Sequence, residues 1–324
     1  MSMTDMFVEK AIAEYADKGV VDNITRATPM LATMPTKQTN KGRENVYEIY
    51  TDIDSISQTE LDAPLTSINA ESKLGRSGLL HWSAKQEVGK GKLNELGVNA
   101  GSYFADKAGR VFMKTGQNFE SSTIYNSIQA TAVANHKKTG TIFTGDRVHN
   151  FGGTTASKQF SVEIVTWDGD TTTGLYDNAS FGGIRQGMFE VGAIGNGTYL
   201  DSNGVEVYGA SYRMDAGVQL ANAQNVTAIA NIEKTATLVA DLKTGNADYY
   251  LSLMLERADP ASGTPYIYMH PELQIAFSHA FKDNVNQTAF NIGGFETMIT
   301  TWNGIPIIST RNMANGTEKV ITGL

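Results

Sequence analysis

The stretch FSVEIVTWDGDTTTGLY, residues 160–176, decides how the fold is interpreted. Its apolar residues Phe160, Val162 and Ile164 recur at every second position, which is the side-chain period of a β-strand. The strand then runs into an Asp-Gly-Asp turn at residues 168–170. The stretch therefore predicts a strand that ends in a tight turn.

Turn signals outside that stretch indicate further strands. Residues 140–230 as a whole are expected to be β-rich, with a hairpin at the DSNG of residues 201–204, because Asn-Gly supplies the positive φ that tight turns need. A second Asn-Gly pair, at residues 303–304, predicts a hairpin between residues 295–302 and 305–309.

Helical periodicity is clearest over residues 100–126, where Ser102 is a candidate N-cap. One face of this helix carries Phe104, Ala108, Val111, Thr115 and Phe119. A second short helix is expected at about 127–137. Nearer the C-terminus, helical stretches are expected to break near residues 245–246, and Pro271 opens another helix.

The N-terminal third contains a candidate projecting hairpin. Residues 44–54 and parts of 79–88 are rich in β-branched and aromatic residues and flank a polar stretch. Each arm holds about 20 residues and could extend on the order of 60 Å, three times the radius of gyration of about 20 Å for a compact chain of this length. Because a two-stranded ribbon is marginal alone in water, a projecting hairpin should lie on a neighbouring subunit. The alternative is that both strands join the sheet of the body.

Residues 3–18 predict a short amphipathic helix, and residues 19–43, with two prolines and many polar side chains, predict an extended arm. No apolar run near this end indicates a signal peptide, and no stretch approaches the roughly 20 apolar residues of a membrane helix. We therefore expect a soluble protein that is found in the cytoplasm.

Composition excludes several kinds of chemistry. The 324-residue chain has no cysteine, which excludes disulfides, thiolate metal sites and cysteine nucleophiles. Its net charge of −8 disfavours general binding to the phosphate backbone of nucleic acids. The five histidines show no metal-ligand spacing, and neither a nucleophile elbow nor a phosphate-binding loop occurs. We predict no catalytic, cofactor-binding or metal-binding residues.

Three segments, taken in order, resemble the major capsid proteins of tailed double-stranded DNA bacteriophages, in particular a podophage-like group. The first is residues 160–176, which resembles the strand-and-turn segment of that group. The second is YGASYRMDAGVQL at 208–220, followed by VTAIANI at 226–232. The third is YIYM at 266–269 with its helix, then residues 295–302 and the strand GIPII at 304–308.

This resemblance implies an α+β fold of the Hong Kong ninety-seven type. It also implies a division of the chain into four parts. These parts are an N-terminal arm (1–43), an extended loop (44–88), a peripheral domain with a spine helix at about 100–126 (89–232), and an axial domain whose C-terminus returns to the peripheral domain (233–324).

The resemblance further implies a structural role without enzymatic activity. Copies would assemble as hexamers and pentamers into the icosahedral head shell, which encloses double-stranded DNA without sequence-specific binding. Since residues 1–43 leave no room for a long scaffolding domain, a separate scaffolding protein is expected, together with a portal and possibly a decoration protein. No cofactor and no membrane partner are implied.

Candidate contacts between subunits come from the arm, the ribbon and the loop. Tyr47, Ile49, Tyr50 and Trp82 are expected to serve the packing of the ribbon, and Phe7 is expected to make a contact from the arm. Charged residues are expected at the loop contacts. The full set is Phe7, Tyr47, Ile49, Tyr50, Asp54, Glu60, Asp62, Lys73, Arg76 and Trp82.

Two other interpretations remain open. An encapsulin-like nanocompartment shell protein would have the same fold and enclose enzymes. A β-rich enzyme or carbohydrate-binding module would instead be a monomer or a small oligomer.

Overall fold

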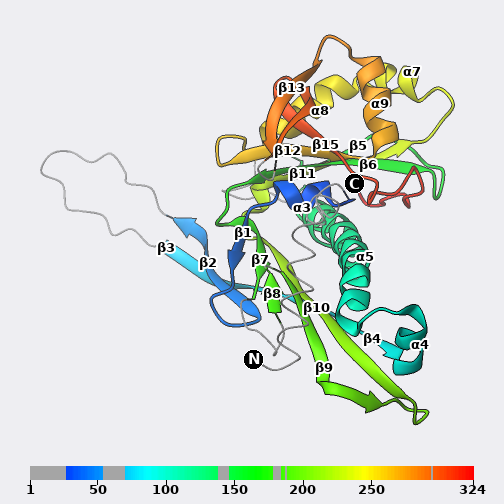
Figure 1. Ribbon diagram of the computed structural model, residues 1–324. Helices are drawn as coiled ribbons and strands as arrows, with labels where there is room; N and C mark the ends of the chain where they lie inside the picture. The colour runs from blue at the N-terminus through cyan, green and yellow to red at the C-terminus, as the bar shows by residue number, and fades with distance from the viewer. Residues whose placement is uncertain (1–26, 54–69, 138–145, 178–183, 187, 293–294) are drawn as a thin grey trace, which may run out of the picture.

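The computed structural model describes residues 27–53, 70–137, 146–177, 184–186, 188–292 and 295–324. Two β-sheets, one long helix and a separate two-stranded hairpin organise these residues (Figure 1). The mixture confirms the predicted α+β class. None of the described helices is both long enough and apolar enough to cross a membrane.

The first large sheet has seven strands, in the order β13-β14-β15-β12-β6-β11-β5. Its strands are β5 (Val148–Asn150), β6 (Gln159–Trp167), β11 (Val226–Glu233), β12 (Thr264–Met269), β13 (Val285–Ile292), β14 (Phe295–Trp302) and β15 (Ile305–Ser309). The strand predicted from Phe160 is confirmed as β6, and it ends before the predicted turn at residues 168–170. The hairpin at Asn303 and Gly304 is confirmed between β14 and β15, and both turn residues have positive φ.

The second sheet is built around one long strand. Its strands are β1 (Thr36–Gln38), β4 (Leu80–Gly89), β7 (Thr172–Tyr176), β8 (Ile184–Gln186), β9 (Phe189–Leu200) and β10 (Glu206–Leu220). Strand β10 pairs with β4, β7 and β9. The predicted hairpin at 201–204 is confirmed, and its strands are longer than the sequence indicated.

One long helix links the two sheets. It consists of α5 (Ala100–Ser122), a π-helical segment η1 (Thr123–Gln129) and α6 (Ala130–Ala134). The predicted helix at 100–126 is confirmed, but the expected N-cap Ser102 is wrong. Asn99 caps the helix, because its Oδ1 accepts a hydrogen bond from the Ser102 amide at 2.8 Å. The second short helix is a continuation of the first through η1.

The remaining helices are short. They are α3 (Pro29–Thr33), α4 (Lys90–Leu96), α7 (Leu238–Thr244), α8 (Ala247–Arg257), α9 (Pro271–Ala280) and a 3₁₀ turn η2 (Ala223–Asn225). The predicted break near 245–246 separates α7 from α8, and Pro271 begins α9 as expected. Helix α3 replaces part of the expected extended arm. The predicted helix at 3–18 lies outside the described residues.

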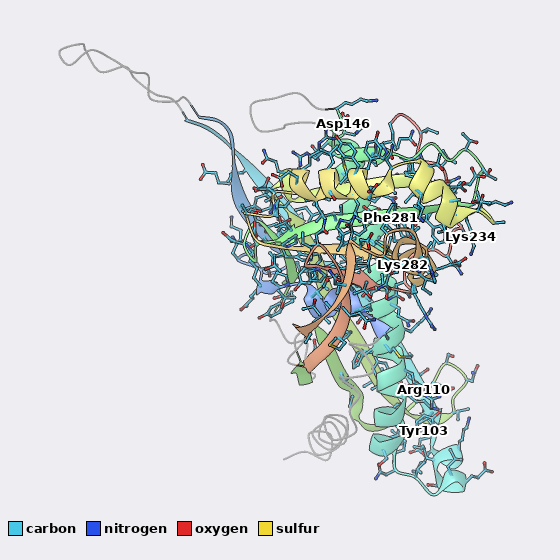
Figure 2. The ribbon with its side chains drawn as sticks, turned by 90° about the horizontal axis from the view of Figure 1, so that it is seen from above. Tyr103, Arg110, Asp146, Lys234, Phe281 and Lys282 are labelled. Atoms are coloured by element: carbon cyan, nitrogen blue, oxygen red, sulfur yellow. The ribbon has the colours of Figure 1, made fainter. Side chains whose placement is uncertain are left out.

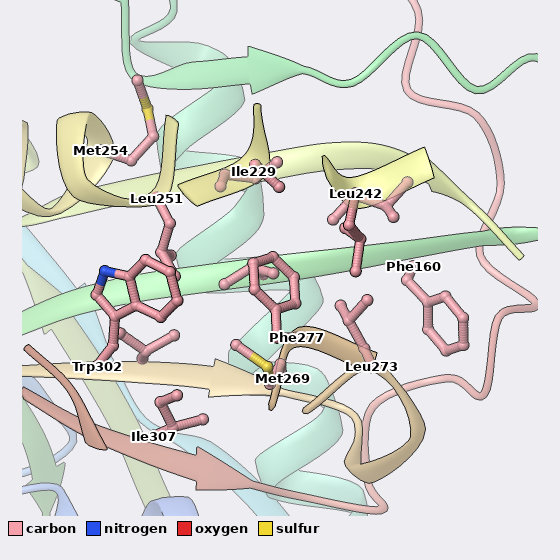
Figure 3. Close-up of a cluster of buried hydrophobic side chains, with 14 of the residues drawn as sticks. Phe160, Ile229, Leu242, Leu251, Met254, Met269, Leu273, Phe277, Trp302 and Ile307 are labelled. Atoms are coloured by element: carbon pink, nitrogen blue, oxygen red, sulfur yellow. The ribbon is translucent and has the colours of Figure 1, made fainter. Parts of the chain in front are cut away.

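The seven-stranded sheet separates two hydrophobic cores. Phe160, Val162 and Ile164 of β6 face α7, α8 and α9, and Figure 3 shows this cluster closing around Phe277 and Trp302. The alternate residues of β6 face the other way, toward α3 and the long helix. Every residue of β6 is buried, because both faces of this central strand are covered.

The hairpin differs from the prediction. Strand β2 (Glu44–Ile53) pairs with β3 (Ala70–Gly78), not with residues 79–88. Strand β4 instead pairs with β10 along its whole length, from Gly89 to Leu80. The polar residues of β3 gave little strand signal, while Trp82 and Val88 of β4 pack against the body.

Sheet membership also differs from the expected division at residue 232. Strands β5, β6 and β11 belong to the same sheet as the strands after residue 264. A boundary drawn by strand pairing would therefore pass within the expected 89–232 unit.

Candidate assembly surfaces

The β2–β3 hairpin projects from the body as a separate ribbon (Figure 1). Its register runs from Glu44 opposite Gly78 to Ile53 opposite Ala70, with an irregularity after Tyr50. These two strands form a sheet of their own, with no third strand among the described residues. A ribbon of this kind buries little apolar surface by itself.

Several of the ribbon's described side chains are open to solvent. Leu74 is 69% exposed, and Tyr47 is half-buried beside Ser77, whose Oγ lies 3.3 Å from the Tyr47 hydroxyl. Arg76 and Glu44 form an ion pair at 3.7 Å, with more than half of each side chain exposed. The ribbon thus offers an apolar residue and a pair of charges to whatever lies against it.

The root of the ribbon is anchored firmly. Asn45 is buried and donates a hydrogen bond to Gln219 of β10, and Gln219 in turn donates to the Asp170 carbonyl at 2.9 Å. A Cβ added at Gly217 would lie 2.6 Å from the Gly78 carbonyl oxygen, so only glycine allows this approach of β3 to β10. The direction of the ribbon is therefore set by the body.

The predicted contact residues other than Trp82 fall into three groups. Tyr47 and Arg76 lie on the ribbon, as expected. The backbones of Ile49, Tyr50 and Lys73 also lie in its strands, but their side chains fall outside the description. Also outside the described residues are Phe7, Asp54, Glu60 and Asp62.

Trp82 has a different position from the one expected. It lies on β4 in the second sheet, and its ring makes an edge-on contact with Phe119 of α5 at 5.3 Å between centroids. The ring is half-buried against the core of its own chain. Any contact of Trp82 with a neighbouring copy stays a prediction.

Two further hairpins present exposed apolar residues. At the tip of the β9–β10 hairpin, Leu200 and Val205 are 68% and 51% exposed. Figure 1 places this tip beside α4, at the end of the molecule away from the seven-stranded sheet, and Figure 2 shows the long helix reaching toward the same end with Tyr103 and Arg110. The β13–β14 hairpin carries Met298, which is 63% exposed.

A buried polar layer between β6 and the long helix was not predicted. It contains Glu120, Glu163 and Glu318, which lie far apart in the sequence. Burial raises the pKa of Glu120 to about 7 and, together with repulsion from Glu318, that of Glu163 to about 8. A glutamate between Val162 and Ile164, in the middle of a strand with alternating apolar residues, was the one signal available in the sequence.

The chemistry of these surfaces is that of packing and hydrogen bonding. No group of three or more His, Asp or Glu side chains that could hold a metal ion occurs among the described residues.

Comparison with known proteins gives three kinds of result. The family model of the major capsid protein GP7 matches residues 14–322. No curated protein matches significantly. Among solved structures, that of bacteriophage Epsilon15 is similar, with a TM-score of 0.52 and 15% identity, over 89% of this chain and 88% of that chain.

Two other structures resemble the chain more weakly. The bacteriophage JBD30 capsid has a TM-score of 0.48 and 10% identity, over 87% of this chain and 92% of that chain. The SrpI encapsulin of Synechococcus elongatus has a TM-score of 0.43 and 8% identity, over 63% of this chain and 87% of that chain.

Proposed function

The chain belongs to the major capsid protein GP7 family, and from this premise we propose how its surfaces build a shell. It is a structural protein of the phage head, a component of the virion, and has the Hong Kong ninety-seven-type capsid fold. Many copies assemble into that shell. The proposal concerns which parts of the chain join the copies and which other components take part.

The ribbon of β2 and β3 lies across a neighbouring subunit in the shell. The observation that carries this proposal is that β2 and β3 pair only with each other among the described residues, while leaving Leu74 exposed. Ordering such a ribbon costs conformational entropy that its own contacts do not offset. A surface on the next copy would bury Leu74. The root of the ribbon already fixes its direction, so the ribbon would point toward that surface.

The other parts take the roles that the resemblance implies. The second sheet and α5 form the peripheral part, and the seven-stranded sheet with α7, α8 and α9 forms the axial part around the centre of hexamers and pentamers. Residues 1–43 form the arm, and a separate protein supplies scaffolding during assembly in the host cytoplasm. The role is structural, without catalysis, and the shell encloses DNA without reading its sequence.

The experiment replaces Leu74 by serine, which removes the exposed apolar side chain of the ribbon and leaves its strand pairing in place. A matched control, Tyr249→Ser, removes an exposed aromatic side chain from α8. Size-exclusion chromatography and negative-stain electron microscopy compare the assemblies, and thermal unfolding checks the fold of each variant.

We expect shells, rings or tubes from the wild type and the control. Leu74→Ser should melt within a few degrees of the wild type and remain mostly in small species. Shells from Leu74→Ser, equal in yield to wild type, would refute the role of the ribbon. A wild-type chain that stays monomeric at high concentration would contradict self-assembly.

A further inference from the structure

The C-terminal segment, residues 310–324, returns along the buried face of β6 without forming a helix or strand. Its backbone is tied down at a few points. The Glu318 amide donates to the Gln159 carbonyl at 3.1 Å, the Ile321 amide donates to Asn231 Oδ1 at 2.8 Å, and the Ala314 amide donates to the Tyr125 hydroxyl at 2.7 Å. The segment is therefore held by these polar contacts together with Met313, Ile321 and Leu324, which pack in the core beside the long helix.

Two carboxyl groups, those of Glu163 and Glu318, lie near these contacts on one face of β6. Glu163 of β6 is completely buried, and Glu318 of the segment is half-buried above it. Gln129 donates to Glu163 Oε1 at 2.9 Å. Ser161, two residues from Glu163 on the same face of β6, donates to Glu318 Oε1 at 3.0 Å, and the Tyr125 hydroxyl donates to the same oxygen at 2.8 Å.

Within the described structure, the pair has no compensating cation. No lysine or arginine forms an ion pair with Glu163 or Glu318 in the described parts of the chain. Of the elements packed against Glu163, η1 presents Tyr125, β12 places Tyr268 opposite it in register, and β11 places Ala228 there. The second oxygen, Glu163 Oε2, is buried without a hydrogen-bond partner.

Two adjacent negative charges in this setting are costly, because a buried charge needs a counter-charge or enough donors. A proton on Glu163 removes one of the two charges and leaves Oε2, which has no hydrogen-bond partner, uncharged. Burial raises the pKa of both groups, and repulsion from Glu318 raises that of Glu163 further. The pair therefore keeps one proton near neutral pH.

We propose that Glu163 and Glu318 form a one-proton latch that holds the C-terminal segment against β6. While the pair keeps one proton, Glu318 stays hydrogen-bonded to Ser161 and Tyr125. When the proton leaves, two buried carboxylates repel each other, and the segment around Glu318 detaches, because Glu163 lies in the fully buried strand β6 between β11 and β12. Detachment releases the amides of Glu318 and Ile321 and uncovers Tyr125 of the long helix.

Hydrogen exchange of the full-length, unassembled chain tests the latch, with the amides of Glu318 and Ile321 as the readout. Exchange is measured from pH 5.5 to 9 and divided by the intrinsic rate at each pH. Glu163→Gln keeps the size of the side chain and removes the ionisation. Glu256→Gln, on the exposed side of α8, is the matched control.

In the wild type and in Glu256→Gln, protection of these two amides should fall by about tenfold or more between pH 6 and 9, since one proton is linked to opening. In Glu163→Gln, protection should stay constant over that range. Amides of β11, such as that of Ala228, should stay protected throughout and report that the body remains folded.

Two results would overturn the latch. One is wild-type protection that does not change with pH. The other is a pH-dependent loss in Glu163→Gln with the same midpoint as in wild type, which would assign the transition to another group such as Glu120. If Glu163→Gln does not fold, Glu318→Gln takes its place, with the same expected loss of pH dependence.

Discussion

The backbone amide of Met30 donates a hydrogen bond to Glu120 Oε2 at 3.1 Å, although ninety residues separate them in sequence. Glu120 thereby caps the short helix α3, whose own N-cap Thr28 makes no side-chain capping bond. The other oxygen, Oε1, accepts hydrogen bonds from Thr310 and from Asn312, the latter at 3.1 Å. One glutamate thus joins the start of the described chain, the long helix and the segment after β15.

Replacing Glu120 with alanine should destabilise the subunit. The change leaves the Met30 amide and the buried Thr310 hydroxyl without their acceptor, and each unsatisfied buried group costs roughly 1–3 kcal/mol. We expect the free energy of unfolding to fall by about 2–4 kcal/mol in denaturant titrations. Glu256→Ala, on an exposed helical surface, serves as the control and should change it by less than about 0.5 kcal/mol.

The same glutamate should make stability depend on pH. Because burial raises the pKa of Glu120 from 4.5 to about 7, the folded state binds a proton that the unfolded state releases. This contribution is fully present below pH 4.5 and is lost as pH rises toward 7. The melting temperature of Glu120→Gln minus that of wild type should therefore increase from pH 4.5 to 7 and then level off.

Subtracting the wild-type melting temperature from that of Glu120→Gln removes the contribution of every titratable group that the two proteins have in common. Burial lowers the pKa of His136, His149 and His270, so their contribution has the opposite sign and is lost as pH falls below about 6.5. A difference that stays constant from pH 4.5 to 8 would show that Glu120 is ionised in the folded protein throughout that range.

The sequence predicted the strands and helices whose signal is local. The alternating apolar residues of β6, the Asn-Gly turn before β15 and the helical face of Phe104 and Phe119 all follow from neighbouring residues. The partner of β2 was not predictable in this way, because β3 (AESKLGRSG) has few β-forming residues and is a strand through its pairing alone. The cap on α3 could not be predicted from local sequence either. Glu120 resembles any other helical glutamate, and its contact with α3 exists only in the folded chain.

Trp82 should contribute to the stability of the single subunit. Its ring packs on Phe119 and against the core between the long helix and the sheets. Trp82→Ala should lower the free energy of unfolding by about 2–4 kcal/mol, near the lower end of values for large aromatic residues because the ring is only half-buried. Leu80→Ala changes the exposed residue two positions away on the same face of β4, and should cost less than about 1 kcal/mol.

These variants also separate two roles of Trp82. A subunit destabilised as predicted, with assembly restored at lower temperature, indicates a residue that acts within its own chain. Normal stability with lost assembly would instead place Trp82 at a contact between copies.

Gly217→Ala should disturb the root of the ribbon. The added Cβ would lie 2.6 Å from the Gly78 carbonyl oxygen, a backbone atom that cannot rotate away. We expect a loss of about 1–3 kcal/mol in stability, the range for overpacking at a tight site. Gly78→Ala is the matched change on the opposing strand, where a Cβ meets nothing within 4 Å, and should have little effect. Equal effects from the two variants would mean that β3 and β10 are not held at this separation.

Arg76 tests whether the charges of the ribbon act within the subunit or between subunits. Its ion pair with Glu44 is exposed on both sides, so within one subunit it contributes only about 0–1 kcal/mol. Arg76→Glu should therefore change the free energy of unfolding by less than about 1 kcal/mol. If the ribbon lies on a neighbouring copy, the same change should slow assembly severalfold in light-scattering measurements at low salt, and 0.5 M salt should reduce the difference because it screens exposed charges.

The double variant Glu44→Arg with Arg76→Glu restores the pair within the ribbon. It should recover any stability that was lost, but it should not restore assembly, because the charge presented at each position remains reversed. Full recovery of assembly by the double variant would show that the pair matters only within its own ribbon.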